Sequence, residues 1–224
     1  MKLTILAATG GIGRQLLEQA LAAGHDVTAV VRNPTKLTQP AGQVRVVTTD
    51  LATPDPATLE TAVAGADAVL SGLGPRTRSE AGIASRGTQA IVAAMHATGV
   101  RRIVVVSAAP IATVASPGRP TPPTHDPGDG FFMRHLFNHI AKAAYHTHYA
   151  DLALMEDIVR GSGLNWTVVR PPRLTNTPAT GTYRTAYGHN LRGGWSVARA
   201  DVAQLMLRVL DQPQTINQTI GIAN

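Results

Sequence analysis

Cysteine is absent from the 224 residues of the chain. Its absence excludes a disulfide framework, a thiolate zinc site and a cysteine nucleophile. Aromatic residues are scarce, at 4% of the chain, which argues against the stacking platforms that bind single-stranded nucleic acid. The remaining composition, 44% hydrophobic and 15% charged, is that of an ordinary globular protein. We therefore expect residues 1–224 to form a single domain with its own core.

Lysine is also scarce, with 3 lysines among the 20 basic residues that give the chain a net charge of +6. The arginines are spread along the chain and form no long basic run, a pattern that predicts no nucleic-acid partner. Because the guanidinium fork matches phosphate, arginine favours a small anionic ligand, although codon usage could equally have supplied arginine for lysine. We expect a small-molecule substrate and a monomer or homodimer.

Long hydrophobic runs are missing as well. The first apolar run, residues 3–8, ends at a glycine-rich stretch, whereas a secretory signal needs roughly 7–15 apolar residues before a cleavage site. No stretch approaches the roughly 18 apolar residues of a membrane span. We expect a cytoplasmic protein with no membrane partner.

Short apolar runs alternate along the chain with segments of helical periodicity. The apolar runs predict strands over residues 3–8, 27–31, 44–47, 68–70, 103–106, 166–169 and 219–222. The periodic segments predict helices over residues 13–23, 55–64, 83–97, 131–160 and 199–210. Uninterrupted apolar strands are typical of a parallel sheet covered on both faces. We expect an α/β fold, a Rossmann-type doubly wound parallel sheet with helices on both faces and a small C-terminal lobe on the substrate side.

Two lid-like insertions interrupt this alternation. The first insertion, about residues 108–150, opens with residues 110–127, which hold 6 of the 15 prolines and therefore predict neither a helix nor a central strand. The second insertion, residues 171–195, is a loop with a possible strand at 182–187. Loops this long in a compact domain are usually functional. Both follow the carboxyl ends of predicted parallel strands, where ligands bind in this architecture.

A glycine turn joins the first predicted strand to the first predicted helix. A helix start presents free N–H groups and the positive end of a dipole, and glycine lets the backbone approach a pyrophosphate closely. The strand before the turn and the helix after it are the context that supports dinucleotide binding. The residues predicted to hold the pyrophosphate are Thr9, Gly10, Gly11, Ile12 and Gly13.

The turn resembles the G-A-T-G-x-x-G start of the atypical short-chain dehydrogenase/reductase family, the NAD(P)-binding group that includes NmrA-like proteins and the biliverdin reductase B (flavin reductase) type. One departure is that Ala7 stands where the family has its first glycine, which predicts a slightly wider turn. The likeness extends over nearly the whole chain, through residues 30–32, 49–51, 67–69, 105–107, 162–164 and 169–172.

Arg32 ends the second predicted strand, about 20 residues after the glycine turn, where an NAD site usually carries an acid that binds the ribose 2′-OH. Arginine can pair there with a 2′-phosphate, so we expect NADP(H) to be preferred. If Arg32 only caps the strand and stacks on adenine, NAD(H) remains possible. The resemblance further implies adenine contacts at Asp50 and Leu51, and contacts to the ribose and pyrophosphate at Leu73 and Gly74.

Ser107 directly follows the fifth predicted strand, in the position where the family holds Ser or Thr beside the nicotinamide. Its hydroxyl could polarise a substrate carbonyl or fix the carboxamide of the cofactor, or it could merely cap a turn. Pro171 and Pro172 resemble the proline pair whose backbone borders the nicotinamide. Arg173 follows them and could hold an anionic substrate or form a salt bridge to a lid.

The Tyr-x-x-x-Lys dyad of typical short-chain dehydrogenases is missing. When Glu156 is aligned with the glutamate of the family pattern, the tyrosine position falls on His148 and the lysine position on Leu152. His148 could donate a proton, since the pKa of histidine lies near neutrality, or it could be a surface residue. Without the dyad, dehydrogenation of an alcohol is disfavoured, and reduction of an acceptor that needs no strong acid, such as a flavin or a quinone, is favoured.

Three functions remain open. The first is an NADPH-dependent oxidoreductase that transfers hydride from the nicotinamide to a small flat acceptor, namely a flavin, a quinone or a carbonyl compound. The second is a non-catalytic NADP(H)-sensing regulatory protein of NmrA-like type. The third is an NAD-dependent epimerase or dehydratase, which would depend most on the missing tyrosine. We predict no metal site.

Overall fold

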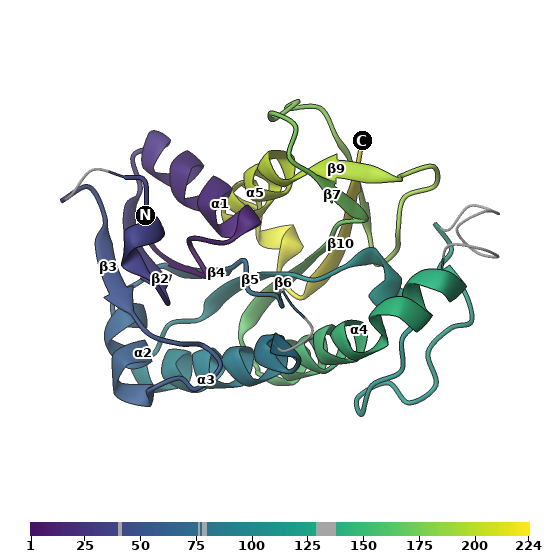
Figure 1. Ribbon diagram of the computed structural model, residues 1–224, viewed down its shortest axis with the longest axis horizontal. Helices are drawn as coiled ribbons and strands as arrows, with labels where there is room; N and C mark the ends of the chain where they lie inside the picture. The colour runs from purple at the N-terminus through teal and green to yellow at the C-terminus, as the bar shows by residue number, and fades with distance from the viewer. Residues whose placement is uncertain (40–41, 76, 78–79, 129–137) are drawn as a thin grey trace.

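The computed structural model describes residues 1–39, 42–75, 77, 80–128 and 138–224. Its parallel strands are β1 (Lys2–Leu6), β2 (Asp26–Val31), β3 (Arg45–Thr48), β4 (Ala68–Ser71), β5 (Arg102–Val106), β6 (Asn165–Arg170) and β10 (Gln218–Ala223). Together with β8 (Arg184–Tyr187), which pairs antiparallel with β10, they form a sheet in the order β3-β2-β1-β4-β5-β6-β10-β8 (Figure 1). The strand order reverses between β1 and β4, and ligands bind beyond the carboxyl ends of the strands at such a point.

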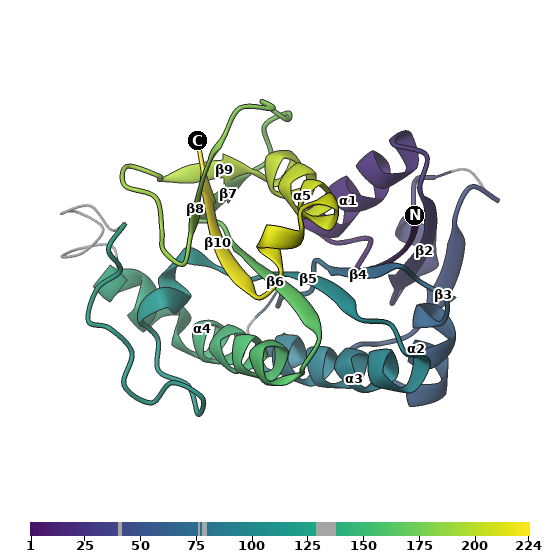
Figure 2. The same cartoon turned by 180° about the vertical axis from the view of Figure 1, so that it is seen from behind.

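Helices cover both faces of the sheet, as Figures 1 and 2 show. On one face α1 (Gly11–Ala22) packs against α5 (Arg199–Arg208). On the other face α3 (Ile83–Thr98) lies between α2 (Pro56–Val63) and α4 (Asn138–Gly161). The expected Rossmann-type doubly wound fold is confirmed, with one antiparallel strand at its edge.

The core has two halves because side chains alternate across a strand. In β1, Ile5 belongs to the cluster under α1 and α5, while Leu6 belongs to the cluster under α2, α3 and α4. Val104 and Val105 of β5 divide in the same way. Burial on both faces explains why these strands read as uninterrupted apolar runs.

The structure departs from the predicted elements around the two insertions. Two short strands that were not predicted, β7 (Arg173–Thr175) and β9 (Ser196–Ala198), pair in a separate small sheet. The prediction of no helix in the proline-rich segment is wrong over Ala109–Thr113, which form a 3₁₀ turn with proline in its first turn, where the missing N–H is not needed. Of the helix expected over 131–160, residues 131–137 lie outside the described part.

Asp126 joins the two insertions. Its carboxylate is buried, and Oδ1 accepts hydrogen bonds from the backbone N–H of Gly128 and of Asn190, both at 2.8 Å. Gly128 belongs to the first insertion and Asn190 to the second. One buried carboxylate therefore links the backbones of both insertions.

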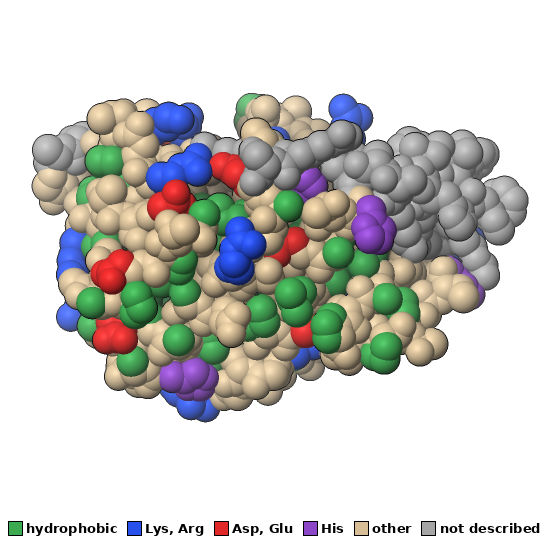
Figure 3. Space-filling view, turned by 60° about the horizontal axis from the view of Figure 1, so that its bottom comes forward, with side chains coloured by type: hydrophobic (Ala, Val, Ile, Leu, Met, Phe, Trp, Pro, Cys, Tyr) green, Lys and Arg blue, Asp and Glu red, His purple; other side chains and the backbone are tan. Residues whose placement is uncertain are grey.

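Side-chain charge is mixed on the face shown in Figure 3, where basic, acidic and hydrophobic groups are interspersed. No extended basic area appears among the described residues on this face. Within the described ranges, no helix combines the length and apolarity that crossing a bilayer requires.

Candidate functional site

The glycine turn is tighter than its sequence suggested. Ala7 adopts a left-handed backbone conformation with φ 56°, the conformation that glycine takes without strain. The N–H of Gly10 donates to the carbonyl of Ala7 at 2.7 Å and closes the turn. The expectation of a wider turn is therefore wrong, because Ala7 takes a left-handed conformation and its carbonyl accepts from Gly10 within a tight turn.

This strain predicts that Ala7→Gly stabilises the protein. Left-handed backbone costs alanine about 1–2 kcal/mol, and glycine loses about 0.5–1 kcal/mol in extra entropy. We expect the free energy of unfolding to rise by about 0.5–1 kcal/mol, measured by urea denaturation. Ala8→Gly is the control, since Ala8 has no positive φ and is buried; that change should destabilise. A loss of stability in Ala7→Gly would contradict the prediction.

Gly13 and Gly72 allow three backbone segments to lie in contact at the site, namely the turn after β1, the start of α1 and the segment after β4. A Cβ added to Gly13 would lie well under 3.0 Å from the carbonyl oxygen of Ala7, and one added to Gly72, which follows β4, would lie 2.9 Å from the nitrogen of Gly13. No side chain among the described residues caps the first turn of α1. The free N–H groups of this turn, with the helix dipole, suit an anion.

A pocket lies over the carboxyl ends of β1 to β4, the place where ligands bind in this kind of sheet. Six residues predicted from the sequence line it: Thr9, Arg32, Asp50, Leu51, Leu73 and Gly74. The other lining residues, to which the sequence analysis assigned no cofactor contact, are Ala7, Val30, Val31, Asn33, Lys36, Thr49, Glu80 and Ile83.

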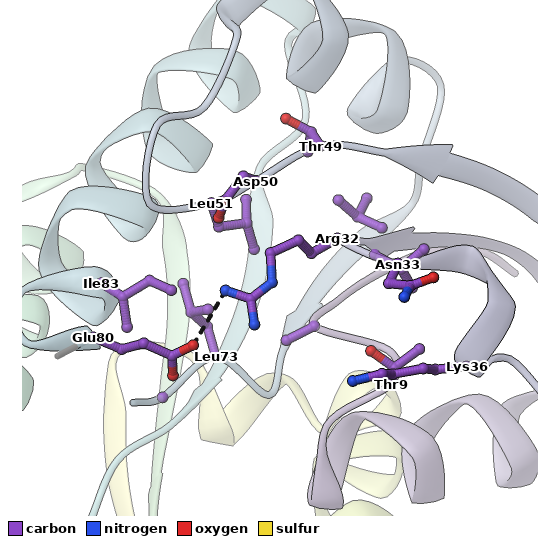
Figure 4. A pocket seen from close by; sticks show the side chains of 14 residues that line it. Thr9, Arg32, Asn33, Lys36, Thr49, Asp50, Leu51, Leu73, Glu80 and Ile83 are labelled. Atoms are coloured by element: carbon purple, nitrogen blue, oxygen red, sulfur yellow. Dashed lines mark hydrogen bonds and ion pairs between the residues drawn. The ribbon is translucent and has the colours of Figure 1, made fainter. Parts of the chain in front are cut away.

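The pocket holds two cations and two acids, seen in Figure 4. Arg32 reaches into it from the end of β2 and pairs with Glu80, with 3.1 Å between Nη1 and Oε1. Lys36 lies on the side nearer Thr9, and no carboxylate within the described part of the chain is in ion-pair distance of it. Asp50 turns inward on its own loop, where Oδ1 accepts from the N–H of Ala52 at 3.0 Å.

Ser107 and the proline pair lie farther along the same edge of the sheet, outside this pocket. The N–H of Ser107 donates to the carbonyl of Val169 at 2.8 Å, and the N–H of Ala109 donates to the carbonyl of Pro171 at 2.9 Å. Pro172 lines a second pocket, together with Ala109 and Asn190. The structure therefore places Ser107 near the proline pair, and their contacts to a nicotinamide stay a prediction.

The other two predicted catalytic residues are not brought to either pocket. Arg173 is exposed on β7. His148 is half-buried on α4, one turn before Asp151. Leu152, at the lysine position of the missing dyad, packs against the hydrophobic core. These two positions therefore do not hold the Tyr–Lys pair of typical short-chain dehydrogenases.

Arg199 is a residue near the turn that sequence reasoning missed. It begins α5, and its Nε would lie 2.7 Å from a Cβ added to Gly11. Its Nη1 donates to Oδ1 of Asn176 at 2.6 Å. Arg199 and Gly11 are far apart in the sequence, so only the packing of α5 against α1 could reveal that they lie close together.

A buried charge cluster lies beneath Ser107. Glu156 of α4 is fully buried, and its carboxylate accepts from Ser107 at 2.6 Å, from Arg160 at 2.6 Å and from Arg170 at 2.6 and 2.8 Å. Burial by itself would raise the pKa of Glu156. The charge and hydrogen bonds of Arg170, then Arg160 and the Ser107 hydroxyl, outweigh burial and lower that pKa below its ordinary value.

The tight glycine turn, the uncapped start of α1 and the pocket over the switch point define a dinucleotide-binding α/β protein. The sequence profile of the NAD(P)H-binding family matches residues 7–213. The chain belongs to that family.

The chain is also similar to individual proteins in sequence and in fold. The chain is 28% identical to YhfK of Bacillus subtilis (strain 168), called an uncharacterized sugar epimerase, over 99% of this chain and 94% of that protein. Its fold is similar to that of ChuY from Escherichia coli O157:H7, called an anaerobillin reductase, with TM-score 0.77, 24% identity and coverage of 100% and 97%. It is also similar to a short-chain dehydrogenase/reductase from Veillonella parvula in complex with NADP, with TM-score 0.75, 21% identity and coverage of 100% and 94%.

Proposed function

We propose that the protein is an NADPH-dependent oxidoreductase that transfers hydride from the nicotinamide to a small flat acceptor, namely a flavin, a quinone or a carbonyl compound. The observation that carries the cofactor preference is the pair of cations, Arg32 and Lys36, in the pocket beside the glycine turn. An arginine fork and a lysine ammonium are the groups that bind a 2′-phosphate.

The rest of the pocket fits the adenosine half of such a cofactor. Leu51, Leu73 and Ile83 are each 6% exposed and give it an apolar wall for the adenine. The free N–H groups of residues 11–13 would hold the pyrophosphate, and the nicotinamide half would continue along the sheet edge toward Ser107. Glu80 gives up its pair with Arg32 when a 2′-phosphate takes its place.

The acceptor class follows from the acids that the site lacks. When bound, NADPH supplies a hydride, and the acceptor takes its proton from water. The positions of the Tyr–Lys dyad hold His148 and Leu152, so nothing there lowers the pKa of a tyrosine base. Flavins and quinones need no strong acid from the protein, whereas an epimerase depends on a base.

Arg32→Ala is expected to weaken NADPH binding about 10- to 100-fold and to leave NADH binding nearly unchanged. A hydrogen bond to a charged group contributes about 1.5–3 kcal/mol, which gives a change of this size. Isothermal calorimetry with both cofactors measures it. Glu80→Gln should act in the opposite direction and tighten NADPH, because Arg32 then has no competing carboxylate.

Arg208→Ala is the matched control, since it removes the same charge from the far end of α5. Equal losses for NADPH and NADH in Arg32→Ala would contradict the assignment of the 2′-phosphate. Oxidation of NADPH is then followed with flavins, quinones and aldehydes. Tight cofactor binding without turnover of any acceptor would contradict hydride transfer and favour the regulatory alternative of NmrA-like type.

A further inference from the structure

The hydroxyl of Ser107 has its proton committed to a buried carboxylate. Ser107 follows β5, and its Oγ lies 2.6 Å from Oε1 of Glu156, which is fully buried. In this contact one of the two oxygens must donate a proton. Which oxygen donates decides what Ser107 can offer to a ligand.

Glu156 cannot be the donor, because both of its oxygens already accept charged hydrogen bonds. Arg170 binds them as a fork, with Nε at 2.8 Å and Nη2 at 2.6 Å, and Arg160 adds a third bond at 2.6 Å. A carboxylate held by two guanidinium groups is ionised, and an ionised carboxylate only accepts. Ser107 therefore donates.

Ser107 then has no donor left. Its single hydroxyl proton points to Glu156, and its backbone N–H donates to the carbonyl of Val169 at 2.8 Å. The lone pairs of Oγ are all that remain. A hydroxyl in this state cannot polarise a carbonyl, because polarisation requires donation toward the carbonyl oxygen.

We propose that Ser107 accepts a hydrogen bond from the carboxamide N–H₂ of the nicotinamide and so sets the orientation of the ring, and that it does not activate the acceptor. This inference rests on the proposed function, which brings the nicotinamide to the ends of β5 and β6. Ser107 lies there beside the proline pair. Glu156 acts as a positioning residue through Ser107, because it fixes the direction of the hydroxyl.

Ser107 takes no part in proton transfer. Bound NADPH would supply the hydride with its electron pair, and the reduced acceptor would take its proton from water. Ser107 keeps its proton throughout. An acceptor whose reduction needs a protein acid is therefore a poor substrate at this site.

The experiment compares binding of NADP⁺ and of its 3-acetylpyridine analogue, in which a methyl ketone replaces the amide and no N–H is left. Calorimetry is done on the natural chain and on Ser107→Ala. One neutral hydrogen bond is worth about 1 kcal/mol net, so Ser107→Ala should weaken NADP⁺ about 5-fold and leave the analogue unchanged. A purely structural role of Ser107 would weaken both dinucleotides equally.

Two variants serve as controls. Ser107→Thr keeps the hydroxyl and should retain the preference for NADP⁺. Ser162→Ala removes a hydroxyl that donates to Val159 at the other end of the sheet, and should change neither affinity. Should Ser107→Ala fail to fold, Ser107→Cys replaces it, since a thiol is of similar shape and a weak acceptor.

The outcomes separate the two proposals. Equal weakening of both dinucleotides in Ser107→Ala, or no weakening of either, overturns the role of Ser107 and leaves the proposed function standing. If the natural chain binds neither dinucleotide, the proposed function falls, and the role of Ser107 falls with it. Selective loss of NADP⁺ is the result expected.

Discussion

Gly13→Ala is expected to lower the free energy of unfolding by about 3 kcal/mol and to abolish binding of NADPH and NADH alike. The added Cβ would lie well under 3.0 Å from the carbonyl oxygen of Ala7 and 2.8 Å from its carbonyl carbon. Both atoms are backbone, so no side chain can move aside. The turn must open, and the N–H groups at the start of α1 then lose their common direction.

Urea denaturation and cofactor calorimetry measure the two losses. Gly161→Ala is the matched control, because Gly161 also belongs to a helix and a Cβ there meets nothing within 4 Å. Its stability should stay the same or rise, since alanine favours helix over glycine by about 0.5–1 kcal/mol. Normal cofactor binding by Gly13→Ala would show that the close approach of α1 to β1 is not needed.

Glu156→Gln is expected to cost about 3–5 kcal/mol of stability at neutral pH, the usual effect of breaking a buried ion pair from one side. Arg170 is 4% exposed and would keep its charge without a counter-ion. Glutamine matches glutamate in shape, so the loss reports charge and not volume. Thermal or urea unfolding of the two proteins gives the difference.

The pH dependence of that difference follows from the lowered pKa of Glu156. A group whose pKa is lower in the folded state stabilises the protein above its unfolded pKa, about 4.3 for glutamate, and stops doing so as the pH falls below it. The difference in free energy of unfolding between the natural chain and Glu156→Gln should therefore have its full size above about pH 5 and decrease as the pH falls below that. A gap that does not change down to acid unfolding would contradict this account.

Asp157→Asn is the control for the second prediction. Asp157 is the neighbouring carboxylate on α4, and it accepts one exposed hydrogen bond, from the N–H of Gly118 at 2.8 Å. Asparagine keeps an acceptor there, so the stability should change by less than about 1 kcal/mol. The contrast between adjacent positions identifies the buried ion pair as the cause of the large effect.

Local pattern was enough to predict the sheet and the start of the cofactor site. Each buried strand is a short apolar run, and the glycine turn stands between a strand and a helix, so both can be recognised within about ten residues. Arg32 could be assigned to the pocket because it directly follows β2, and the ends of parallel strands share one edge of the sheet.

The rest of the site depends on contacts between distant segments. Glu80 follows β4, and nothing near it in the sequence indicates that it pairs with Arg32. The sequence analysis used Glu156 only to align a family pattern. In the structure Glu156 is buried, pairs with Arg170 and accepts a hydrogen bond from Ser107. The left-handed conformation of Ala7 could not be read from an alanine, since that residue normally avoids it.

Asp126 links two segments that are far apart in the sequence, the first and the second insertion. Its Oδ1 is shared by the N–H groups of Gly128 and Asn190, and no Cβ could fit between those backbones at Gly128. Moving either segment alone would remove one of the two hydrogen bonds that the buried carboxylate of Asp126 accepts. The two insertions are thus linked, since the amide of Asn190 also donates to the carbonyl of Ala109 at 3.2 Å, and a substitution at Asp126 disturbs the backbones of both.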